Sequence, residues 1–251
     1  MKTATRIHLQ AEEDNDDEQI GTVLSRRRAL TLLGSAGALL GAGGLLTSRA
    51  GAASTASTAL PSCVVRPAQT EGPYFVDEKL NRRDVRSDPA SGKIEAGVPL
   101  TLGFLVTQVG AGGCKPLPGV QVDIWHTNAL GHYSDIGGEG TKGQKFLRGY
   151  QMTDAQGVAT FQTIYPGWYN GRTVHIHFKL RRGNSTFTSQ LFFDEALSDK
   201  VYTQAPYNTR GARTTRNAQD NIYGNGGHQL MLDAKPSGQG YAAVFDVGMN
   251  L

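Results

Sequence analysis

The residues from Pro99 to the end form a series of short alternating segments separated by glycine-rich turns, and no long helical pattern lies among them. In the segment VQVDIW, for example, Val120, Val122 and Ile124 share one face of an extended strand. Several short strands at this spacing are typical of an all-β sandwich. We therefore predict a single antiparallel β-sandwich domain over residues 99–251.

Two details of strand pairing follow from the turns. In the turn TDAQG, Asp154 and Gly157 occupy the first and fourth positions, where a type I turn prefers them. This turn joins LRGYQM to VATFQTI, and we predict that these two segments pair as a hairpin. The segments QLMLDA and YAAVFDVGM are predicted to be the last two strands.

The first 53 residues have the pattern of an export signal. A basic cluster at Ser25-Arg26-Arg27 precedes an apolar stretch from Ala29 to Leu46, and a small-residue cleavage site follows. The paired arginines are typical of a twin-arginine signal. We predict cleavage near residue 53, no stable membrane span afterwards, and a periplasmic or extracellular protein; retention of the signal as an anchor is the alternative.

Residues 54–98 are rich in Ser, Thr and Pro and show little periodicity, so we predict an extended N-terminal arm. The chain has two cysteines, Cys63 in this arm and Cys114 in the body. An even pair in an exported protein favours one disulfide, which would close a loop of ~50 residues and stabilise the fold by about 4 kcal/mol. Two separate thiols are the alternative.

Two histidines share one face of a predicted strand. In TVHIHFKL, the apolar side chains alternate with His175 and His177, so both imidazoles point to the same side. Same-face residues lie about 6.5 Å apart along a strand, which allows both rings to reach one metal ion. A pair of solvent-facing polar histidines is the alternative for this pattern taken alone.

The next strand supplies a neighbour for this pair. Gly183-Asn184 separates two strand-like runs, which is the signal of a two-residue hairpin turn. That turn pairs Arg182 with Ser185 and therefore places Gln190 opposite His177. A slipped register is the alternative.

The residues near the histidines favour a hard cation. Zinc motifs of the HExxH or CxxC kind are absent, and no Asp or Glu lies between His177 and Asp194. The available anionic ligands are tyrosines, whose pKa of about 10 falls to neutral pH only beside a strong cation. Phenolate oxygen prefers a hard ion such as Fe³⁺.

Three stretches together resemble the intradiol ring-cleavage dioxygenases, in particular exported relatives of protocatechuate 3,4-dioxygenase subunits. They are QTEGPYF, LPGVQVDIWHTNALGHYSD and TIYPGWYNGRTVHIHF. The resemblance implies a non-haem Fe(III) held by four ligands, with an arginine and a glutamine in the substrate pocket and an arm tyrosine lining it. The implied ligands are Tyr133, Tyr169, His175 and His177; the implied pocket residues are Arg172, Gln190 and Tyr74, and Tyr169 is also implied to act in catalysis.

The other aromatic and imidazole groups nearby are expected to be structural. Tyr150 and Tyr165 are expected in the core, and Trp125 in the core or the pocket wall. His126 and His132 are expected to support the first tyrosine rather than bind metal.

The resemblance implies an enzyme that cleaves a catechol-type diol between its two hydroxyl-bearing carbons and incorporates both atoms of O₂. The net charge of +3 is spread along the chain, which gives no reason to expect nucleic-acid binding.

The alternatives are a metal-free exported binding module, and a divalent-metal hydrolase that adds a distant ligand such as His228. If the substrate carries a carboxylate, Arg148 and Arg181 are candidate partners. The sequence decides neither the individual substrate nor the oligomeric state.

Overall fold

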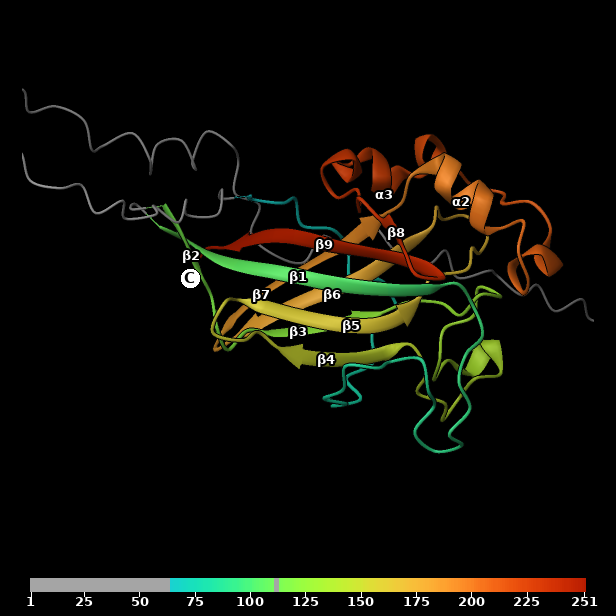
Figure 1. Cartoon of the computed structure of the whole chain (residues 1–251), viewed down its shortest axis with the longest axis horizontal. Coiled ribbons are helices and arrows are strands. Elements are labelled where there is room, and N and C mark those ends of the chain that lie inside the picture. Colours follow the sequence, from blue (N-terminus) through green and yellow to red (C-terminus); the bar gives the residue numbers. More distant parts are fainter. Residues whose placement is uncertain (1–63, 111–112) are drawn as a thin grey trace, which may run out of the picture.

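The structure is a computed structural model that describes residues 64–110 and 113–251, and its β-strands form two layers (Figure 1). The first sheet contains β1 (Pro99–Gly110), β2 (Gly113–Pro116), β5 (Val158–Ile164), β8 (Lys235–Ser237) and β9 (Gly240–Met249). The second contains β3 (Gln121–Trp125), β4 (Arg148–Met152), β6 (His175–Arg182) and β7 (Ser185–Phe192). The predicted β-sandwich is confirmed.

The first sheet departs from a purely antiparallel arrangement at one place. Its order is β2-β1-β9-β8, and β5 shares the β2 edge of β1 at the other end of that long strand. The first and last strands of the domain, β1 and β9, run parallel from the Leu100–Tyr241 pair to the Gln108–Met249 pair. The second sheet has the order β4-β3-β6-β7 and is antiparallel throughout.

The core lies between the two sheets and contains alternate residues of the long strands. In β6, Ile176, Phe178 and Leu180 are fully buried on the inner face. Phe178 meets Phe104 of β1 and Phe245 of β9, with ring centroids 5.2 and 5.6 Å apart. Since this face is filled with apolar side chains, the strand must direct His175 and His177 to its other face.

One expected strand pairing and one expected strand are wrong. The turn forms as predicted, with the Gly157 amide donating to the carbonyl of Asp154 at 2.9 Å. However, β4 pairs with β3 and β5 pairs with β1, so this turn carries the chain from one sheet to the other. The segment 229–234 forms only one isolated bridge, Met231 with Phe192, because Leu230 and Leu232 turn into the core instead.

Helical segments connect β7 to β8 and gather at one end of the sandwich (Figure 1). They are α2 (Glu195–Val201), η2 (Tyr207–Arg210), η3 (Asn217–Gln219), α3 (Asn221–Gly224) and η4 (Gly227–Gln229), while η1 (Gly137–Glu139) lies between β3 and β4. None of the helices in the described ranges has the length and apolar character needed to cross a membrane.

The N-terminal predictions fall partly outside the described residues. From residue 64 to 98 the arm contains isolated bridges and turns. The export signal and Cys63 lie outside the described residues. Cys114 is buried in β2, and there is no free cysteine in the part of the chain that the structure describes. The Cys63–Cys114 disulfide therefore stays a prediction.

Candidate metal centre

The two histidines of β6 face each other at the end of the second sheet. Both are buried, and their Nε2 atoms lie 3.1 Å apart. The Nδ1 atom of His175 lies 2.6 Å from the carbonyl oxygen of Thr173, so Nδ1 carries the proton and Nε2 presents its lone pair to His177. The ring of His177 is stacked on Trp125, with centroids 4.8 Å apart and planes within 9°.

Both imidazoles are neutral in this environment. Burial, followed by the positive charge of Arg172, lowers the pKa of His175 to about 3. Burial also holds the pKa of His177 well below its usual value. The Nδ1 atom of His177 is buried and has no hydrogen-bond partner among the described residues. Two neutral rings with converging Nε2 atoms form a nitrogen pair suited to binding a cation.

Two phenol oxygens complete the cluster. The Oη atom of Tyr133 lies 3.2 Å from His175 Nε2, and that of Tyr169 lies 3.4 Å from the same atom. The loops that carry the tyrosines cross closely at Gly131, whose φ is +78°. A Cβ there would lie 2.1 Å from the Trp168 carbonyl oxygen, so only glycine permits the crossing that brings the two rings together.

The environment of Tyr133 opposes ionisation unless a cation is present. Burial, and then the neighbouring Tyr169, raise its pKa well above the usual range, while the charges of Arg172 and Arg148 act in the opposite direction. The four side chains together offer two oxygens and two nitrogens, with no thiolate. This donor set fits a hard, highly charged metal ion, since such an ion supplies the attraction needed to ionise buried phenols.

For a divalent-metal site, the described residues offer no third His, Cys, Asp or Glu ligand beside the two histidines. His228 is exposed. Within residues 64–110 and 113–251, no three His, Cys, Asp or Glu side chains come together in a way that could hold a metal ion. The side-chain oxygens that lie against the histidine pair are those of Tyr133 and Tyr169.

Arg172 and Gln190 lie next to each other beside the cluster. The predicted hairpin register is confirmed, with His177 opposite Gln190 and Arg182 opposite Ser185. The Nη2 group of Arg172 donates to Gln190 Oε1 at 2.6 Å, and its Nε group donates to Asp220 Oδ2 at 3.0 Å. The amide of Gln190 donates to the Thr70 carbonyl in the arm at 3.0 Å.

The arm also reaches the tyrosines. The ring of Tyr74 is stacked on that of Tyr133, with centroids 4.4 Å apart, and meets Tyr169 edge to face at 6.2 Å. The structure thus brings together seven of the predicted residues: Tyr74, Tyr133, Tyr169, Arg172, His175, His177 and Gln190.

The two arginines considered for a substrate carboxylate are engaged elsewhere. Arg148 is buried and donates to the backbone oxygens of Ser134 and Tyr74. Arg181 lies near the end of β6 remote from the histidines and pairs with Asp123 and Asp77.

Structural contacts are found for His126, His132 and Tyr165, whereas Tyr150, which was expected in the core, is only partly buried in β4. His126 is buried between the Thr127 carbonyl and the Thr163 hydroxyl. His132 lies 3.7 Å from Glu139, and the buried Tyr165 hydroxyl lies 2.7 Å from that of Ser198.

Two residues of this region were missed from the sequence. Asp220 contacts Arg172, and Asn217 contacts Thr173 through the threonine hydroxyl at 2.5 Å. Both follow α2 in a segment without clear periodicity. Asp220 could have been identified as a helix N-cap, but an N-cap signal says nothing about a contact with a residue 48 positions earlier.

Comparison with known proteins identifies relatives of the chain. A family model described as Dioxygenase matches residues 70–218. The structure is similar to that of an intradiol ring-cleavage dioxygenase from Tetranychus urticae, with a TM-score of 0.67 and 30% identity over 75% of this chain and 95% of that chain.

Two curated relatives match over shorter stretches. Catechol 1,2-dioxygenase 1 of Acinetobacter lwoffii is 29% identical over 45% of this chain and 40% of that protein. Chlorocatechol 1,2-dioxygenase of Pseudomonas sp. strain P51 is 28% identical over 51% of this chain and 55% of that protein. The matches therefore span about half the length of these relatives.

Proposed function

Because the chain belongs to the intradiol ring-cleavage dioxygenase family, we propose that it cleaves the aromatic ring of a catechol-type diol between the two hydroxyl-bearing carbons. Both atoms of O₂ enter the product, a muconate-type diacid. The observation that carries this proposal is the convergence of three donor atoms on His175 Nε2. They are the Oη atoms of Tyr133 and Tyr169 and the Nε2 atom of His177, at 3.2, 3.4 and 3.1 Å.

In this proposal, four residues hold a non-haem ferric ion: Tyr133, Tyr169, His175 and His177. When bound there, ferric iron supplies Lewis acidity, which favours ionised oxygen donors and makes the ring of a bound diol reactive toward O₂. The residues suit this ion because two phenols can each lose a proton, while the buried imidazoles stay neutral. Tyr133 Oη keeps its proton until a cation arrives, since burial raises its pKa.

In the proposed reaction, Tyr169 accepts a proton and Arg172 stabilises negative charge. Tyr169 is less buried than Tyr133, so its Oη atom is the better placed of the two to accept a proton from a substrate hydroxyl. Arg172 supplies a fixed positive charge where negative charge develops on a substrate oxygen. Gln190 holds the guanidinium, and Tyr74 forms a wall of the pocket beside Tyr133.

The test is to purify the exported portion, from residue 54 onward, and to measure its iron content and visible spectrum. We expect one ferric ion per chain and a broad tyrosinate-to-iron absorption band that shifts when catechol or protocatechuate is added without oxygen. With oxygen, at least one of these diols should yield the corresponding muconate. A colourless protein that takes up no iron would overturn the proposal and favour the binding module.

Tyrosine variants provide the matched control. Tyr133→Phe and Tyr169→Phe should each change or remove the absorption band. Tyr165→Phe removes an equally buried hydroxyl that contacts Ser198 rather than the cluster, and it should leave the band unchanged. If Tyr165→Phe alters the band and the other two do not, the assignment of the ligands is wrong.

A further inference from the structure

Arg172 is a buried cation, and its orientation depends on a residue from a distant part of the chain. The residue is 7% exposed, and its Nε group donates to Oδ2 of Asp220 at 3.0 Å. A second nitrogen of the guanidinium, Nη2, donates to Gln190 Oε1 at 2.6 Å. Because the guanidinium is planar, acceptors on two of its nitrogens fix the plane of the group as well as its position.

Asp220 is itself held rigidly. Its Oδ2 atom also accepts the Thr173 amide at 2.7 Å, and its Oδ1 atom accepts the amides of Ile222 and Tyr223 at 2.8 and 3.0 Å. The carboxylate therefore caps α3 and at the same time binds the segment that precedes β6. Four donors on one buried carboxylate leave it little freedom to move.

The segment that carries Asp220 is anchored on its other side by Asn217. The Asn217 side chain accepts the Thr173 hydroxyl at 2.5 Å and donates to the Phe193 carbonyl at 3.0 Å. Its backbone amide donates to Glu195 of α2 at 2.6 Å.

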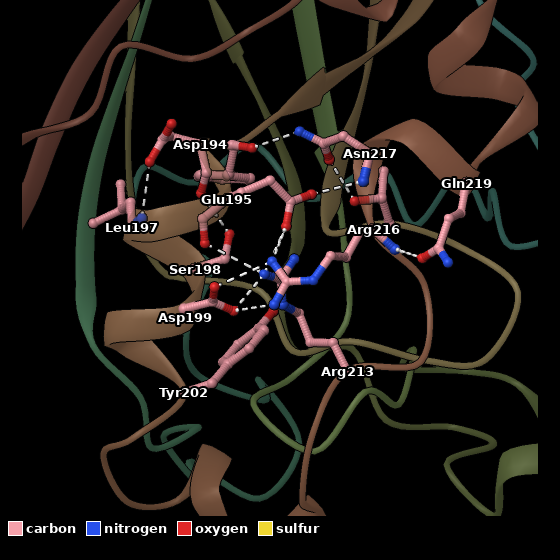
Figure 2. A network of polar contacts seen from close by, with 12 residues as sticks. Asp194, Glu195, Leu197, Ser198, Asp199, Tyr202, Arg213, Arg216, Asn217 and Gln219 are labelled. Atoms are coloured by element: carbon pink, nitrogen blue, oxygen red, sulfur yellow. Dashed lines mark hydrogen bonds and ion pairs between the residues drawn. The ribbon is translucent and has the colours of Figure 1, made fainter.

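A hydrogen bond and ion pairs connect Asn217 to charged side chains of the same helical region. Figure 2 shows Glu195 between the Asn217 backbone and Arg213 and Arg216. Arg213 and Arg216 also pair with Asp199, one turn further along α2. The helical segment is thus tied to itself by ion pairs and to the metal centre by Asn217 and Asp220.

We infer that Asp220 is the positioning residue for Arg172: it fixes the guanidinium at the metal centre and balances its charge there. This inference rests on the proposed function, in which Arg172 stabilises charge on the substrate. Asp220 acts through Arg172 and does not touch the four ligand atoms. Loss of its negative charge should therefore reduce turnover while iron remains bound.

The first test compares Asp220→Asn with Asp194→Asn. In Asp220→Asn the side-chain amide retains the size of the carboxylate, but it lacks the charge and presents an N–H group to one set of donors. We expect kcat to fall about 30-fold, KM to change less than about threefold, and iron content to stay the same. Asp194 is the matched control because it caps α2 through the Leu197 amide and is exposed. Asp194→Asn should retain activity within about twofold.

A second variant addresses folding. Asp220→Ser provides a good N-cap for α3 but has no charge and too short a side chain to reach Arg172 as well. If Asp220→Asn does not fold, Asp220→Ser should show the same loss of kcat. Full activity in either folded variant would overturn the inference.

A double-mutant cycle separates positioning from a general structural effect. Arg172→Lys keeps the charge but loses the planar pair of donors. If Asp220 acts through Arg172, Asp220→Asn should cost less than about threefold in the Arg172→Lys background. A full and additive 30-fold loss in that background would mean that Asp220 acts by another route.

A measurement without iron tests the contact even if the proposed function fails. The Nε–H proton of Arg172, identified in NMR spectra by its absence from Arg172→Lys, should exchange with water at least about tenfold faster in Asp220→Asn. Unchanged exchange would overturn the inference. An inactive, iron-free wild-type protein with slow Nε–H exchange would instead refute the proposed function and leave the contact intact.

Discussion

Two buried arginines flank the candidate metal centre, and they are held in opposite ways. Arg148 donates to the Tyr74 carbonyl and to the carbonyl and hydroxyl of Ser134, all of which are neutral acceptors. Arg172 donates to the carboxylate of Asp220 and to the amide of Gln190. Arg148 therefore uses its donors to hold two chain segments together, whereas Arg172 is itself held by two other side chains.

The charged surroundings of the two arginines also differ. Burial lowers the pKa of Arg148, and the acidic groups around it do not reverse that shift. Burial also acts against Arg172, but Tyr169, Asp220 and Tyr133 together raise its pKa above the usual value. The difference teaches that a buried cation can serve the fold or the chemistry. We expect changes at Arg148 to appear mainly in stability and changes around Arg172 mainly in turnover.

The largest expected effect is on the free energy of unfolding of Arg148→Met. The apolar side chain keeps much of the volume but leaves the carbonyl oxygens of Tyr74 and Ser134 without their donors in a buried place. At about 1–3 kcal/mol for each of these two groups, the loss should total about 2–6 kcal/mol. Urea unfolding of the iron-free protein measures it.

Arg86→Met is the control for that measurement. Arg86 forms an ion pair with Asp84, and both side chains are partly exposed at 33% and 48%. Its loss should cost less than about 1 kcal/mol. A similar, small loss in Arg148→Met would contradict the role of Arg148 in holding the arm against the Tyr133 loop.

The second effect is on the pH dependence of stability. His126 lies on the Arg148 side, and burial lowers its pKa to about 4. Because the unfolded chain binds this proton near pH 6.5, stability is complete above that pH and decreases as the pH falls from 6.5 to 4. One group shifted this far contributes about 3 kcal/mol.

Asp220, which contacts Arg172, also has a shifted pKa, but as an acid it affects stability over a different pH range. Burial opposes its ionisation, but the charge of Arg172 and the amide donors prevail and lower its pKa below the usual 3.8. Its contribution is therefore present above about pH 4 and lost only below it. Urea unfolding at several pH values should show a shallower loss between pH 6.5 and 4 in His126→Gln than in the wild type. Identical slopes in His126→Gln and the wild type would contradict the assignment to His126.

Much of this centre was predictable because local signals determine it. The alternation in TVHIHFKL puts both histidines on one face, and the two-residue turn at Gly183-Asn184 fixes the register that places Gln190 opposite His177. Each of these inferences spans only a few residues. The tyrosines needed a different signal, the resemblance of whole stretches to a known family.

The structural features that the sequence did not predict have a common physical cause. The turn at Asp154–Gly157 was recognised, but a turn reverses the chain without deciding which sheet receives the next strand. The support of Arg172 by Asp220 was missed because it depends on how the helical segment packs against the sandwich. Such contacts are set by tertiary packing, which periodicity and turn chemistry do not encode.

The smallest expected effect is at Gln190, where the two sides meet through the arm. Arg148 contacts the arm directly at Tyr74, whereas Arg172 contacts it through Gln190 and Thr70. Gln190→Met retains the shape of the side chain but removes the acceptor for Arg172 and the donor for Thr70. Since Asp220 still holds the Nε group of the guanidinium, kcat/KM should fall only about tenfold, equivalent to ~1.4 kcal/mol. Thr188→Val, a change at a buried hydroxyl in the same strand that has no hydrogen-bond partner in the described part of the chain, is the control and should stay within about twofold. If Gln190→Met proves as damaging as Asp220→Asn, the amide contributes as much as the carboxylate, and the contrast between the two arginines rests on geometry rather than on charge.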